Sequence, residues 1–153
     1  MAKQDNVVIV GAARTPMGGF NGSLSSVSAT DLGAIAIKEA VSRAGIDATD
    51  VEEVVMGNVL PAGLKQGPAR QAMRKAGLAD ATGATTINKL CGSGMKATMF
   101  AHDAIKAGSI NIAVSGGMES MSNAPYILEG VRTGLRMGAG PAPQDHMFLD
   151  GLM

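Results

Sequence analysis

Cys91 is the residue whose type and position best suit covalent chemistry. It follows a short β-branched run at residues 85–88 and opens a helical pattern that continues to about residue 107. A side chain at such a strand-to-helix turn faces free backbone N–H groups and the positive end of the helix dipole, and both favour a thiolate. Gly92 and Gly94 let a substrate approach the backbone closely, and the N–H of Cys91 is a candidate oxyanion donor. This pattern indicates acyl transfer through a thioester.

Two other interpretations of this turn remain open. A buried, inert cysteine that packs as a small hydrophobe fits the position equally well. In addition, the run from Gly92 to Ala97 fits G-x-G-x-x-G/A after a strand, and Glu119 follows at the spacing of a dinucleotide site. That fingerprint normally occupies the first strand-to-helix turn, whereas residues 11–16 of this chain do not contain it. The dinucleotide interpretation is therefore the weaker one.

The composition argues against several classes of function. The 153 residues include 13 Lys and Arg and 13 Asp and Glu, so we expect neither nucleic acid nor an anionic membrane as a partner. One Cys and two widely spaced His argue against a metal site. No apolar run reaches the roughly 18–20 residues that cross a bilayer, and the first residues do not resemble a signal peptide. Because a lone cysteine also suits a reducing compartment, we expect a cytoplasmic protein.

Strand and helix signals alternate along the chain, which predicts an α/β fold. The helical pattern around residues 91–107 is nearly all small or apolar, so we expect that helix to be buried on most sides. Beyond residue 120 the chain is rich in turn residues. The predicted strands cover residues 6–10, 51–60, 85–88 and 110–114, and the other predicted helices cover residues 30–44 and 69–76.

Four segments, in order, resemble the thiolase family. Residues 87–97, Ile-Asn-Lys-Leu-Cys-Gly-Ser-Gly-Met-Lys-Ala, look like the acyl-enzyme segment of thiolases. Together the four cover nearly the entire chain, which resembles the N-terminal portion of a thiolase. Lys89 and the pair Met95-Lys96 look closest to acetyl-CoA acetyltransferases of the acetoacetyl-CoA type. The other three segments are residues 11–16 with Gly18 and Phe20 after them, residues 67–71 and residues 116–122.

The resemblance implies both a reaction and an architecture. The reaction is condensation of two acetyl-CoA molecules, or thiolysis of a 3-oxoacyl-CoA by CoA, with Cys91 taking the acyl group. A CoA thioester is then a substrate, and no cofactor is bound permanently. The architecture is two similar α/β halves, each with a mixed sheet and helices, so residues 1–120 are expected to form the N-terminal domain and residues 121–153 the start of an inserted loop domain. A ketosynthase, which shares this fold and a cysteine nucleophile, is the closest enzymatic alternative.

Two motifs that the family needs are not in this sequence. They are a Gly-His-Pro histidine and a Cys-Gly-Gly cysteine, both in the C-terminal half of the family's chain. His102 does not replace the histidine, because at ~1.5 Å per residue it lies about 16 Å along the helix from Cys91, and His146 is expected in a surface loop. We therefore expect a fragment that is inactive alone and works beside the C-terminal half of the same enzyme, in a homodimer or homotetramer. A non-catalytic half-fold that self-associates is the second hypothesis.

Overall fold

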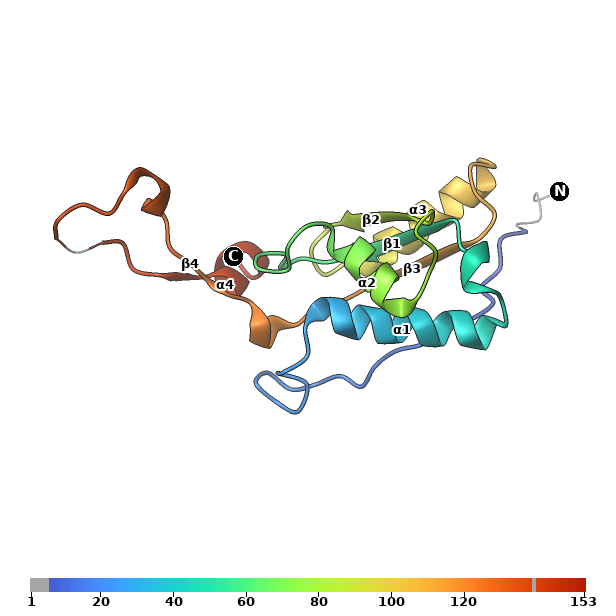
Figure 1. Ribbon diagram of the computed structural model, residues 1–153, viewed down its shortest axis with the longest axis horizontal. Coiled ribbons are helices and arrows are strands. Elements are labelled where there is room, and N and C mark those ends of the chain that lie inside the picture. Colours follow the sequence, from blue (N-terminus) through green and yellow to red (C-terminus); the bar gives the residue numbers. More distant parts are fainter. Residues whose placement is uncertain (1–5, 139) are drawn as a thin grey trace.

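The computed structural model describes residues 6–138 and 140–153 and contains a three-stranded parallel sheet at its centre (Figure 1). The order is β2 (Gly83–Ile87), β1 (Glu53–Gly57), β3 (Ala113–Gly117), with Val55 paired to both Thr85 and Ser115. Helices α1 (Ala29–Ala44) and α2 (Pro68–Ala76) cover one face, and α3 (Ser93–Lys106) covers the other. The predicted α/β fold is confirmed, although each strand is displaced from or shorter than its predicted range.

The main core lies between β1 and the pair α1 and α2. Val54 and Met56 of β1 pack there against Ile37 of α1 and Met73 of α2, and all four side chains are buried. Val55 is also buried, as expected for the central strand of a parallel sheet covered on both faces. This explains why β1 is a continuous apolar run rather than an alternating one.

Local signals set the helix ends. Ser28 caps α1 by accepting a hydrogen bond from the Asp31 N–H, and Gly45 ends the helix with a left-handed φ of 66°. Pro68 opens α2, and Gly77 closes it in the same left-handed way. The helices therefore match the predicted ranges to within one or two residues.

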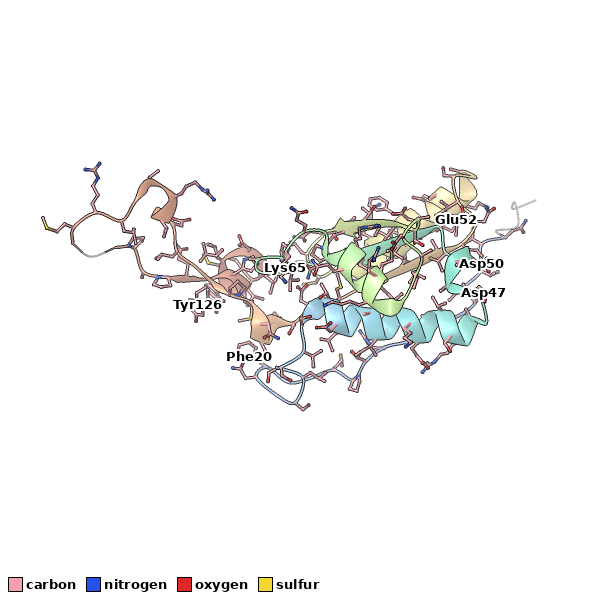
Figure 2. All side chains as sticks on the ribbon, viewed as in Figure 1. Phe20, Asp47, Asp50, Glu52, Lys65 and Tyr126 are labelled. Carbon is pink, nitrogen blue, oxygen red and sulfur yellow. The ribbon has the colours of Figure 1, made fainter. Side chains whose placement is uncertain are left out.

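The remaining chain is built from short elements. The described residues include three 3₁₀ helices, and an antiparallel pair joins β4 (Tyr126–Ile127) to β5 (Gln144–Asp145), directly before α4 (His146–Gly151). Residues 128–138 and 140–143, between β4 and β5, extend away from the sheet layers, and Tyr126 at the start of β4 is largely exposed (Figure 2). The boundary near residue 120 between a domain and a loop domain stays a prediction. The 3₁₀ helices are η1 (Ala48–Asp50), η2 (Met121–Asn123) and η3 (Val131–Thr133).

The predicted strand at residues 6–10 is wrong. This segment is extended but forms no strand, and Ile9 is 83% exposed. It runs beside α1, where Arg43 Nη1 donates to the Ala12 carbonyl at 3.0 Å, and a cavity of about 950 Å³ is lined by both this segment and β3. An apolar run becomes a strand only when a neighbouring strand takes its backbone hydrogen bonds, and no strand of the described residues pairs with this segment.

The expectation that the helix after Cys91 is buried on most sides is also wrong. Only Ser93, Ala97 and Ala101 of α3 are buried, because only one face of the helix packs on β1 and β3. On the other face Met95 is 70% exposed. Composition alone cannot tell whether a second layer covers such a helix.

Candidate functional site

Cys91 lies in the turn between β2 and α3, as predicted. β2 ends at Ile87, α3 begins at Ser93, and the Cys91 side chain is exposed. The alternative of a buried cysteine is therefore wrong, and the reactivity of the thiol stays a prediction. The turn belongs to the edge of the sheet formed by the carboxyl ends of the parallel strands, where ligands commonly bind in open α/β sheets.

The turn holds a strained backbone next to the thiol. Leu90 has a left-handed φ of 49°, a conformation that costs a residue other than glycine about 1–3 kcal/mol. Two side chains hold it: Asn88 Oδ1 accepts the Leu90 N–H at 2.9 Å, and the Ser93 hydroxyl donates to the Leu90 carbonyl at 2.6 Å. The Ser93 oxygen also accepts the N–H of Lys89 at 2.8 Å. These bonds fix the backbone on both sides of Cys91.

Backbone donors at this turn are available to a ligand. Among the described residues, the N–H groups of Cys91 and Gly94 have no hydrogen-bond acceptor. Gly92 caps α3 without a side-chain hydrogen bond, so the positive end of the helix is left open. The predicted role of the Cys91 N–H as an oxyanion donor is compatible with this geometry and stays a prediction.

Glycines let α3 begin directly on the sheet. A Cβ added to Gly57 of β1 would lie 2.5 Å from Ser93 Cβ and 2.7 Å from the Gly94 nitrogen. A Cβ added to Gly117 of β3 would lie 3.4 Å from the Gly94 Cα. The carboxyl ends of β1 and β3 therefore determine how closely the Cys91 turn approaches the sheet.

Glu119 follows β3 at the same edge of the sheet. Its Oε1 accepts hydrogen bonds from Asn58 Nδ2 at 2.7 Å and from the Leu60 N–H at 3.0 Å, and its Oε2 accepts the Val59 N–H at 2.9 Å. Burial raises the pKa of Glu119, and the N–H donors and the nearby His146 oppose that rise only in part. Because its oxygens are occupied by these internal donors, the carboxylate does not fit the ribose-binding role of the dinucleotide interpretation.

The prediction that His146 lies in a surface loop is wrong. His146 begins α4 and is only 4% exposed, with Nδ1 2.6 Å from Asp150 Oδ2 and Nε2 accepting the Ala62 N–H at 3.4 Å. The sequence does contain a signal for this helix, because Asp145 is a capping residue and Asp150 follows His146 by one turn. His102 lies on the side of α3, as expected, with Nδ1 3.1 Å from Asp103 Oδ1.

Two further features of residues 6–138 and 140–153 bear on function. No group of three or more His, Cys, Asp or Glu side chains is arranged to hold a metal ion. No helix in this part of the chain has the length and apolar character needed to cross a membrane.

Comparisons with known proteins identify relatives across nearly the whole chain. The family model "Thiolase, N-terminal domain" matches residues 7–153. An acetyl-CoA acetyltransferase of Escherichia coli is 55% identical over 97% of this chain, and one of Cupriavidus necator is 54% identical over 96%. The matches cover 38% and 37% of those relatives, so this chain spans well under half of their length. In structure, the Acat5 thiolase of Ascaris suum, solved in complex with coenzyme A, superposes with a TM-score of 0.90 at 41% identity, over 95% of this chain and 37% of that one.

Proposed function

This chain belongs to the thiolase family, and from that premise we propose that Cys91 takes an acyl group from a CoA thioester. The observation that carries the proposal is the exposed thiol of Cys91 in a turn whose backbone is fixed on both sides. A fixed nucleophile loses little freedom when it reacts, which lowers the barrier. The N–H groups of Cys91 and Gly94 are free to bind an oxyanion beside it.

The proposed step is a thioester exchange. The Cys91 thiolate adds to the carbonyl carbon of acetyl-CoA, and the carbonyl oxygen takes up the electron pair as an oxyanion. When the carbonyl re-forms, the bond between its carbon and the CoA sulfur breaks. CoA leaves as a thiolate that takes a proton from solvent, and the acyl group stays on Cys91 Sγ.

We propose that the complete cycle is condensation of two acetyl-CoA molecules, or thiolysis of a 3-oxoacyl-CoA in reverse. The second half of that cycle needs a base, and a base must lie within hydrogen-bond reach of the proton that it removes. Neither His146, which bonds to Asp150 and Ala62, nor His102, on the flank of α3, fits this role. The relatives are more than twice as long as the matched region. We therefore infer that further residues, like those in the longer relatives, supply the base, and that this chain alone does not turn over.

The test is acylation of Cys91 by radiolabelled acetyl-CoA, located by peptide mass spectrometry. The chain is assayed alone and in a chimera in which it replaces the matched part of the Escherichia coli acetyltransferase. We expect label at Cys91 in both proteins and turnover only in the chimera. Cys91→Ala should abolish the label, whereas Gly19→Ala, in the remote N-terminal loop, should retain it. Label that persists in Cys91→Ala would disprove the assignment.

A further inference from the structure

We propose that Glu119 is a positioning residue for the Cys91 turn, acting through residues 58–60 and Asn88. The inference rests on the proposed role of Cys91, because it concerns how that thiol is held. Glu119 and Cys91 follow different strands, β3 and β2, and β1 lies between them in the sheet. The residues that follow β1 therefore lie where they can connect the two.

The first link is the carboxylate of Glu119. It accepts three hydrogen bonds, all from residues 58–60, which follow β1 directly. Without it, the N–H groups of Val59 and Leu60 would have no acceptor among the described residues, and such groups seldom stay unpaired in a folded protein. Glu119 thus sets the path of the chain where it leaves β1.

The second link joins residues 58–60 to the end of β2. The Asn58 N–H donates to the Ile87 carbonyl at 3.0 Å, and the Asn88 side-chain amide donates to the Val59 carbonyl at 3.5 Å. The second of these contacts orients the Asn88 amide, because its nitrogen faces Val59. The amide oxygen then faces the turn.

The third link reaches the residue before the nucleophile. Asn88 Oδ1 accepts the N–H of Leu90, whose left-handed backbone needs such a restraint. If Asn88 turns away, Leu90 can relax and carry Cys91 away from the N-terminus of α3. Cys91 is already exposed, so a looser turn gains no access and only moves the thiol away from the free N–H groups at the start of α3 that a reacting group can contact.

Because Cys91 is the only cysteine of the chain, its alkylation reports directly on how the turn holds the thiol. The readout is the rate constant for alkylation of Cys91 by iodoacetamide at neutral pH. We call the contacts from Glu119 through residues 58–60 and Asn88 to Leu90 the relay. Loss of its last hydrogen bond, which joins the neutral Leu90 N–H to Asn88 Oδ1, should slow alkylation about fivefold. Asn88→Ala and Glu119→Gln should both show this, whereas Glu39→Gln, in the Arg43 ion pair on α1, should match the wild type. The double variant Asn88→Ala/Glu119→Gln should be no slower than either single variant, because both break one chain of contacts.

Asn88→Ser gives a test that does not need a Glu119 variant to fold. Serine keeps a hydroxyl that can accept the N–H two residues on, but it cannot reach Val59. The relay predicts slow alkylation for Asn88→Ser, whereas a purely local role for Asn88 predicts the wild-type rate. The inference would be overturned by wild-type alkylation in Asn88→Ser, or by rate losses that multiply in the double variant.

A second readout separates positioning from general damage. In the acyltransferase chimera, Asn88→Ser should lower kcat about fivefold and leave the KM for acetyl-CoA unchanged, if KM reflects binding. A rise in KM with unchanged kcat would contradict the inference. If Cys91 is never acylated but the alkylation rates follow the relay, the proposed function fails and the positioning of the thiol stands. If acylation occurs and the rate losses multiply, only the positioning fails.

Discussion

Gly57→Ala tests the close approach of α3 to the sheet. The new Cβ would lie 2.5 Å from Ser93 Cβ and 2.6 Å from the Ser93 carbonyl carbon, whereas carbon atoms normally pack about 3.5–4.0 Å apart. The obstacle includes backbone, so the start of α3 must retreat by about 1 Å rather than one side chain rotating. We expect the free energy of unfolding to fall by about 2–3 kcal/mol. Because Ser93 holds Leu90, the retreat should also displace Cys91 and slow its alkylation.

The assay is urea unfolding followed by far-UV circular dichroism, with the denaturant slope checked for constancy. The control is Gly19→Ala, because Gly19 has nothing within 4 Å of its added Cβ and lacks a left-handed φ. The free energy of unfolding of this control should stay within about 0.5 kcal/mol of the wild-type value. In a chain of this size, the melting temperature of Gly57→Ala should be roughly 4–12 °C below that of the wild type. A loss no larger than that of Gly19→Ala would refute the packing argument.

Three further predictions concern stability. Burial raises the pKa of Glu119 above its ordinary 4.5, so the native state binds that proton more tightly than the unfolded chain. The stability that this shift contributes is complete below about pH 4.5 and is lost as the pH rises through the folded pKa. In urea titrations, the stability of the wild type relative to Glu119→Gln should therefore decrease from about pH 4.5 to neutrality. A difference that stays constant with pH would contradict this prediction. Asn58→Asp puts a second carboxylate in a buried position beside Glu119, and should cost about 3 kcal/mol or more by the same titration. Met73→Ala empties a fully buried site and should cost about 2–5 kcal/mol, whereas Met137→Ala, at a fully exposed side chain, should have almost no effect on melting.

Features that depend on near neighbours in the chain were predictable. The helical periods and the glycines after them predict α1 and α2 closely, because 3.6-residue spacing and a left-handed φ are local properties. The strand-to-helix turn at Cys91 was predictable for the same reason. The resemblance of four ordered segments indicated the family, and the family match over residues 7–153 confirmed it.

Features that depend on distant partners were not predictable. The run at residues 6–10 has the composition of a strand, yet a strand needs a hydrogen-bonding neighbour, and sequence does not show whether one is within reach. In the same way, no local pattern could show that one face of α3 stays uncovered or that His146 is buried against Ala62.

The sequence by itself determined the helices α1, α2 and α3, the position of the only cysteine and the family. The tertiary structure alone decided which groups meet beside the Cys91 turn, because Glu119 meets Asn58, Val59 and Leu60 across about sixty residues of chain. Parallel strands bring their carboxyl ends to one edge of the sheet, so residues far apart in the sequence become neighbours there. Their hydrogen bonds depend on distances in space that spacing along the chain does not encode.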